Sequence, residues 1–117
     1  MNGNTIPYKE TVMIKTPSLT NAQKKYLRGL GHSLSPLVYI GKEGLADSVI
    51  NAIDEALERH ELIKVKIVNT DKISKHEAAD LVPQRSRSQL VQLIGKTLLI
   101  YRRNDKKKKD QIKLPPG

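Results

Sequence analysis

Apolar residues recur along this chain at two intervals, one typical of helices and one typical of strands. A first helix is predicted over residues 20–31, where Thr20 and Gln23 have the spacing of a capping box. Its apolar stripe consists of Tyr26, Leu27, Leu30 and Leu34. Pro36 prevents the helix from continuing, because the residue before a proline is driven away from helical dihedral angles.

Two further helices follow the same periodicity. Residues 46–60 carry one apolar stripe, with acidic residues on the remaining surface, which predicts an amphipathic helix. That stripe consists of Val49, Ile50, Ile53, Ala56 and Leu57. A third helix should begin near Asp71 and end before Pro83, with Ile73, Ala78 and Leu81 facing inward.

Four segments have the composition of strands. Residues 36–40 form a short apolar run that ends at Gly41. Residues 62–68 alternate, so that one sheet face is apolar and the other displays lysines. The apolar positions are Ile63, Val65 and Ile67, and the lysines are Lys64 and Lys66.

The last two strands should pair with each other. Residues 90–94 and 97–101 are apolar runs separated by Gly95 and Lys96, which is the spacing of a tight hairpin. The predicted order is therefore α-β-α-β-α-β-β in an α/β domain of the two-layer α+β type.

The chain is expected to contain one domain with two extensions. Residues 19–102 hold all the predicted elements, and 117 residues leave room for one core. Residues 1–18 are polar and contain two prolines, so we expect a flexible extension, or alternatively an added edge strand at 11–14. Residues 103–117 are expected to form a basic disordered tail.

Charge points to a polyanionic partner. The chain has 21 Lys and Arg against 12 Asp and Glu, for a formal charge of +9. The excess is uneven: residues 19–34 carry three basic residues and no acidic one, whereas residues 46–61 carry five acidic residues and one arginine. Such a bipolar molecule can orient itself on RNA.

Catalysis, metal binding and membrane insertion have little support. The chain has no cysteine, and His32, His60 and His76 lack the spacing of a metal site, so we expect no cofactor and no enzyme activity. The carboxylates of the second helix follow its polar side and are explained as a solvated face. No apolar run approaches the roughly 20 residues of a membrane span, which makes the cytoplasm the expected location and excludes a membrane partner.

Two regions are candidates for phosphate contact. In Gly41-Lys42-Glu43-Gly44, the glycines allow close backbone approach and Lys42 adds charge, although glycines at such turns also serve simply to adopt positive φ. Along the first helix, an all-positive flank supports the same contact, and an ordinary solvated face remains the alternative. This flank consists of Lys24, Lys25, Arg28 and His32.

Base stacking has few candidates. The only aromatic residues are four tyrosines, Tyr8, Tyr26, Tyr39 and Tyr101. We therefore do not expect a broad surface of aromatic rings on which several bases stack. Recognition should therefore depend on the RNA backbone and its shape. The basic tail is expected to add affinity without reading sequence, or only to aid solubility.

Several strings resemble the YhbY/CRM family of ribosome-associated proteins. The matching strings lie at residues 40–45, 60–67 and 91–102, together with Leu27, Arg28, His32, Leu34 and Pro36. They span about residues 19–102 in the same order. The resemblance implies a fold like the C-terminal domain of translation initiation factor 3.

The resemblance also implies a function. It suggests an RNA-binding GxxG loop comparable to that of KH domains, in which Gly41 and Gly44 match the loop glycines and Lys42 its frequent basic residue. It further implies association with ribosomal RNA of the large-subunit precursor as a non-catalytic assembly factor, and we expect a monomer. Lys96 in the predicted hairpin completes the candidate RNA-binding set. The alternative is a protein-interaction module whose acidic second helix docks ribosomal proteins.

Overall fold

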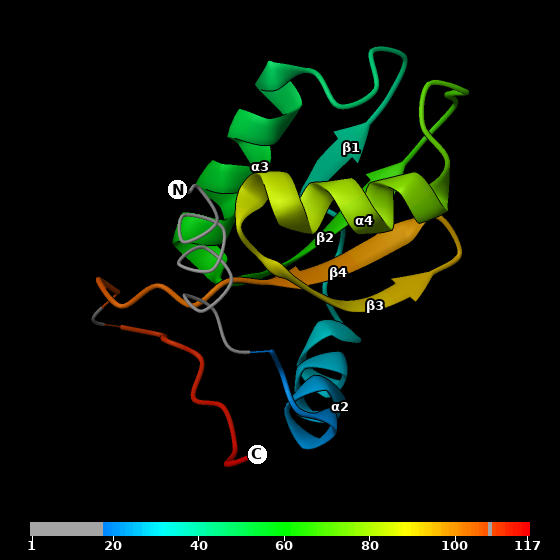
Figure 1. Ribbon diagram of the computed structural model, residues 1–117. Helices are drawn as coiled ribbons and strands as arrows, with labels where there is room; N and C mark the ends of the chain where they lie inside the picture. The colour runs from blue at the N-terminus through cyan, green and yellow to red at the C-terminus, as the bar shows by residue number, and fades with distance from the viewer. Residues whose placement is uncertain (1–17, 108) are drawn as a thin grey trace, which may run out of the picture.

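The helices and strands follow one another in the predicted order (Figure 1). The computed structural model describes residues 18–107 and 109–117, so the expected N-terminal extension lies, apart from Ser18, outside the described residues. The helices are α2 (Asn21–Gly31), α3 (Asp47–His60) and α4 (Lys75–Ser86). The strands are β1 (Val38–Ile40), β2 (Leu62–Ile67), β3 (Gln89–Ile94) and β4 (Thr97–Tyr101). Among the described residues, no helix is long and apolar enough to cross a membrane.

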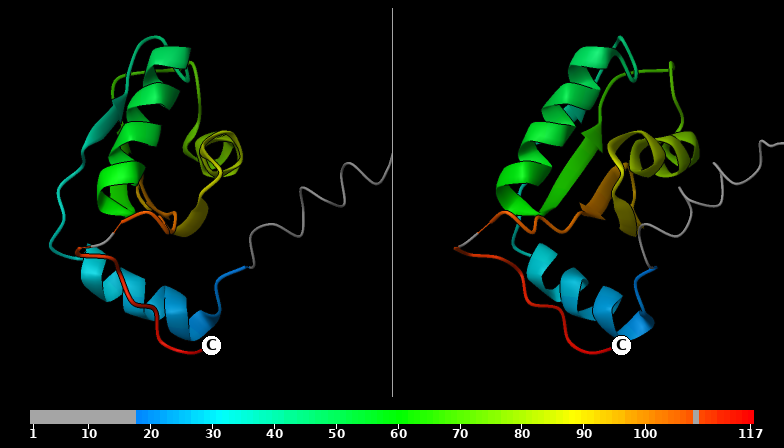
Figure 2. Two further views of the ribbon diagram at one scale, coloured as in Figure 1. Left: turned by 90° about the vertical axis from the view of Figure 1, so that its left-hand side faces the viewer. Right: turned by 60° about the vertical axis from the view of Figure 1, so that its left-hand side comes forward.

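The strands form one mixed sheet in the order β1-β2-β4-β3. β1 and β2 are parallel, and the remaining pairs are antiparallel, which confirms the predicted β3-β4 hairpin. α3 and α4 cover one face of the sheet, and α2 lies across one end of the opposite face (Figure 2). The predicted α+β class and the four predicted strands are thus confirmed, and the sheet that the strands form is mixed.

β2 supplies the centre of the main core. Ile63, Val65 and Ile67 are buried beneath α3 and α4, as their alternation predicts. Ile53 and Leu57 from the apolar stripe of α3 pack in the same cluster and are inaccessible to solvent. Burial of side chains of this size stabilises the fold by about 1.5–3 kcal/mol each.

α2 buries less of its apolar stripe than predicted. Its capping box between Thr20 and Gln23 is present, and Leu27 is buried in a second cluster. The helix lies so close to the sheet that a Cβ on Gly31 would come within 2.7 Å of a Leu99 methyl carbon. The other members of the stripe, Tyr26, Leu30 and Leu34, are exposed. Because α2 covers only part of this face, its contact with the sheet is confined to the turn between Leu27 and Gly31.

α4 begins later than predicted. Ser74 accepts a hydrogen bond from the backbone N–H of Glu77, and the Glu77 carboxylate accepts one from Ser74 in return. This capping box fixes the first helical residue at Lys75 rather than near Asp71.

Pro83 lies inside α4, where the sequence predicts the end of the helix. Proline removes one helical hydrogen bond, but the final turn is closed by the Ser86 hydroxyl, which donates to the Val82 carbonyl at 2.6 Å. Val82 is buried in the core, whereas Leu81, predicted to face inward, is exposed.

The C-terminal segment differs from the disordered tail that its charge predicts. Glu61 is completely buried, and its carboxylate accepts hydrogen bonds from the backbone N–H groups of Asn104 and Ile112. Ile112 and Leu114 pack against the second cluster, next to Leu27. The segment therefore returns along the body of the domain to α2 (Figure 2).

Candidate nucleic-acid interface

The Gly41–Gly44 turn is held by the backbone of its two glycines. The N–H of Gly44 donates to the carbonyl of Gly41 at 3.0 Å, and Gly44 adopts φ +65°, a value that L side chains rarely accept. A Cβ on Gly44 would also lie 3.1 Å from the Cβ of Lys72. Gly41 instead faces open space, and Lys42 is exposed at the tip. One glycine is thus structural and the other leaves the backbone accessible.

Three connections meet at this end of the sheet. The Val68 N–H donates to the Ile40 carbonyl at 2.9 Å, and the Ile67 N–H donates to the carbonyl of Lys96 in the hairpin at 2.8 Å. The exposed lysines of this end are Lys42, Lys72, Lys75 and Lys96. We name this group the loop cluster.

Acidic side chains also occur near the loop cluster. Glu43 is exposed in the turn, and Asp71 lies beside Lys72. The Glu77 carboxylate is engaged with the Ser74 N–H. The four lysines exceed these three carboxylates by one charge, so the balance at this end favours an anionic ligand only slightly.

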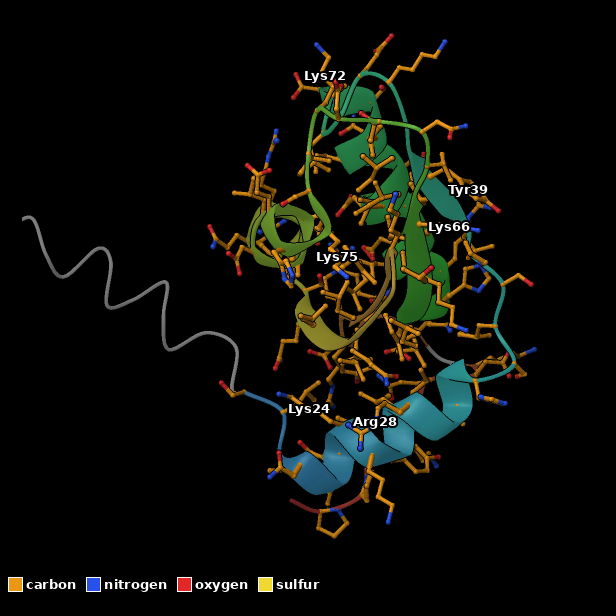
Figure 3. All side chains as sticks on the ribbon, turned by 90° about the vertical axis from the view of Figure 1, so that its right-hand side faces the viewer. Lys24, Arg28, Tyr39, Lys66, Lys72 and Lys75 are labelled. Carbon is orange, nitrogen blue, oxygen red and sulfur yellow. The ribbon has the colours of Figure 1, made fainter. Side chains whose placement is uncertain are left out.

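A narrow part of the sheet remains open between the loop cluster and α2. Tyr39 pairs with Lys66, which pairs with Thr97, which pairs with Ile94, and all four lie on the face opposite α3 and α4. We call these four residues the open row. In Figure 3, Lys66 and Tyr39 lie between Lys72 at one end and Lys24 and Arg28 at the other.

The basic residues of α2 lie far from the loop. Lys25, Arg28 and His32 are exposed and Lys24 is partly buried, but the helix lies at the opposite end of β2 (Figures 1 and 3). The two candidate regions for phosphate contact, the loop and the basic flank of α2, are therefore separate in the structure. α2 packs over Leu62 and over Leu99, the register partner of Lys64, so the end of β2 at Lys66 and Ile67 lies between α2 and the loop.

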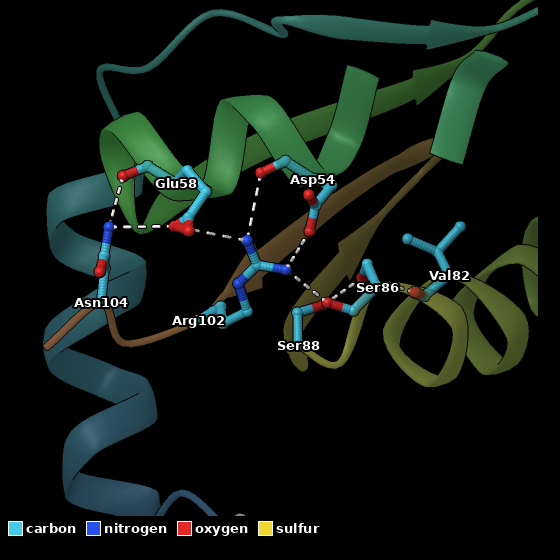
Figure 4. Close-up of polar contacts among 7 residues, drawn as sticks. All are labelled: Asp54, Glu58, Val82, Ser86, Ser88, Arg102 and Asn104. Carbon is cyan, nitrogen blue, oxygen red and sulfur yellow. Dashed lines mark hydrogen bonds and ion pairs between the residues drawn. The ribbon is translucent and has the colours of Figure 1, made fainter. Parts of the chain in front are cut away.

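The acidic surface of α3 is partly engaged within the chain (Figure 4). The Arg102 guanidinium contacts the Asp54 carboxylate at 2.7 Å and the Glu58 carboxylate at 3.9 Å. Asn104 also donates to the Glu58 carboxylate at 3.1 Å, and Arg102 donates to the Ser86 carbonyl. These contacts tie α3 to the end of α4 and reduce the charge that α3 offers to a partner.

The sequence predictions omitted four residues of this surface. Lys66 was visible as an outward position of an alternating strand, and Tyr39 occupies the corresponding outward position of β1. No sequence pattern marks Lys72 and Lys75 as neighbours of the loop, because their position depends on the tertiary contact between Lys72 and Gly44.

Comparison with known proteins identifies the family. The model of the CRS1 / YhbY (CRM) domain matches residues 19–102. The chain belongs to this family. "Probable RNA-binding protein YqeI" of Bacillus subtilis is 43% identical over 97 residues, which is 83% of this chain and 99% of that protein. An "RNA-binding protein" of Haemophilus influenzae is 38% identical over 84% of this chain and 96% of its own length.

A solved structure has the same fold. The solution structure of a hypothetical protein from Staphylococcus aureus matches with a TM-score of 0.68 and 42% identity. The match covers 83% of this chain and 99% of that chain.

Proposed function

We propose that this chain binds RNA across the loop cluster, the open row and the basic flank of α2. The observation that carries the proposal is that exposed Lys66 lies between Lys72 and Arg28 on one side of the domain. The Lys96 carbonyl accepts from the Ile67 N–H next to Lys66, and the backbone of Gly41 faces open space. Relatives named as RNA-binding proteins support the same ligand.

Phosphate contact is the chemistry that this surface offers. Lysines neutralise phosphates without reading the bases, and a glycine without Cβ lets a phosphate approach the backbone N–H groups. The proposed role is non-catalytic: the protein accompanies folding RNA rather than changing it covalently. The proposed target is ribosomal RNA of the large-subunit precursor, reached in the cytoplasm by a monomer without a cofactor.

Docking of ribosomal proteins on acidic α3 is the weaker candidate. Two of its carboxylates, Asp54 and Glu58, already contact Arg102. A basic partner would have to displace the Arg102 guanidinium from these carboxylates. The loss of those ion pairs would reduce the net binding energy of the partner. Glu55 is exposed and remains available for such a contact.

Charge reversal tests the RNA surface. Lys42→Glu and Lys96→Glu change exposed side chains and should leave the fold intact while weakening binding to a ribosomal RNA fragment at least roughly tenfold. Arg59→Glu is the matched control, because it makes the same charge change on the exposed surface of α3. An equal loss in the control would show that net charge, and not this surface, governs binding.

Crosslinking in cells tests the proposed target. Sequencing of RNA attached to the wild-type protein should give a concentrated peak in large-subunit ribosomal RNA and its precursors. Lys42→Glu should lower that peak. A spread over messenger RNA without a ribosomal peak would refute the ribosomal role and leave RNA binding itself standing.

A further inference from the structure

The open row joins the two basic regions, and its chemistry differs from theirs. We infer that this row holds an unpaired RNA base stacked on the Tyr39 ring, with the adjoining phosphate at Lys66. The inference rests on the proposed RNA binding and adds the form of RNA that the site takes, a single strand with accessible bases.

Tyr39 is positioned as a rigid platform. Its neighbours Val38 and Ile40 are buried on the α3 side, so the strand geometry directs the Tyr39 ring to the opposite face. There 52% of the residue is exposed, although a tyrosine is large and apolar. A tyrosine has only two side-chain torsions, so it loses little conformational entropy when a ligand stacks on it.

Lys66 provides a cation next to the ring. It is the register partner of Tyr39 in the parallel pair and is exposed on the same face. Two residues earlier in β2, the Lys64 ammonium donates to the Leu34 carbonyl at 2.9 Å, which holds the connection after α2 in place. Lys64 is thus structural, and Lys66 is the lysine that faces a ligand.

The neighbourhood of the ring alternates apolar and cationic groups. In the open row, Tyr39 and Ile94 are exposed at the two ends, and exposed Lys66 lies between them. Nucleotides present a flat base beside an anionic phosphate and match such an alternation. A protein partner with an apolar surface would bury Lys66 and Arg28 without anions, which is unfavourable.

A single strand fits this site better than a duplex. Bases inside a duplex are already stacked on one another, so their faces are closed to a protein ring. From an unpaired base at the open row, the strand can continue toward Arg28 in one direction and toward Lys96 in the other (Figure 3 shows Arg28).

The test compares Tyr39→Ala with Tyr39→Phe and wild type. The probes are a single-stranded RNA of about twelve nucleotides and a blunt duplex of the same length, with binding measured by fluorescence anisotropy. Tyr26→Ala is the matched control, because Tyr26 is a similarly exposed tyrosine on α2. Circular dichroism of each variant verifies the fold.

Tyr39→Ala should bind the single strand roughly tenfold more weakly and the duplex unchanged, because one base–aromatic stack is lost. Tyr39→Phe and Tyr26→Ala should bind both probes like wild type. Equal binding of the single strand by wild type and Tyr39→Ala, or equal losses on both probes, overturns the stacking site alone. Failure of the wild-type protein to bind either probe overturns the proposed RNA binding as well.

Discussion

The Glu61 carboxylate accepts a hydrogen bond from the backbone N–H of Ile112 at 2.7 Å, across 51 residues of sequence. Its second oxygen accepts from the Asn104 N–H at 2.8 Å. Glu61 is completely buried and adopts φ +64° at the end of α3. A buried carboxylate requires such donors, and hydrogen bonds to a charged acceptor are stronger than neutral ones. Glu61 therefore fixes the path of the C-terminal segment.

Glu61→Ala should destabilise the domain by about 2 kcal/mol, because it leaves two partly buried N–H groups without acceptors. The C-terminal segment should also detach, which would increase amide hydrogen exchange at Asn104 and Ile112. Chemical denaturation and hydrogen exchange measure the two effects. Glu55→Ala changes an exposed carboxylate on the same helix and should do neither.

Removal of residues 109–117 should loosen α2. The deletion exposes the apolar cluster around Leu27 and removes the hydrogen bond from the Gln23 side chain to the Pro115 carbonyl. Hydrogen exchange should rise in α2 and stay unchanged in α4, which packs on the other face. Retention of wild-type exchange rates in α2 would show that the segment does not support this helix.

Local periodicity predicts most of this fold. Strand alternation, the hairpin at Gly95 and the capping box at Thr20 depend on residues close in sequence, and all three are confirmed. Pro83 misled the prediction because the contacts that keep α4 intact come from Ser86 and the packing of Val82. The composition of the C-terminal segment, in which lysines dominate, predicts disorder. The residue that holds the segment in place, Glu61, lies far away in sequence and is not visible in that composition.

The candidate surface was only partly predictable. The loop and the basic flank of α2 are visible as local motifs, but the distance between them depends on how α2 docks on the sheet. Gly31 packs against Leu99 in the middle of β4, so α2 covers this face up to that position and leaves the part nearer the loop open. That docking leaves the open row between the two motifs, and no local pattern reports it.

Gly44 and Gly41 should respond differently to alanine. Gly44→Ala places a side chain at φ +65° against Lys72 and should lower stability by about 1–2 kcal/mol. Gly41→Ala adds its Cβ to open space and should leave stability unchanged. Thermal denaturation of both variants checks the contrast. Similar losses in both would mean that the turn differs from the geometry described.

Alkaline pH should destabilise the domain through Tyr101. Burial, and then the charge of Glu61, raise the pKa of the Tyr101 phenol above 10.0. Because the folded state holds the proton more tightly, this contribution to stability is complete below pH 10.0 and is lost as the pH rises toward the folded pKa. The difference in unfolding free energy between wild type and Tyr101→Phe should therefore change above pH 10.0 and stay constant below it.

The separation of α2 from the loop cluster predicts a length dependence of RNA binding. A strand must cross the open row at Tyr39 and Lys66 to touch both, which takes several nucleotides at ~3.4 Å each when they are stacked. Affinity for single strands should therefore rise steeply up to this length and then level off. In the double variant Lys24→Ala/Arg28→Ala, the rise should be lost while very short strands bind as they do to wild type. A rise that persists in this variant would mean that RNA leaves the loop cluster in a direction away from α2.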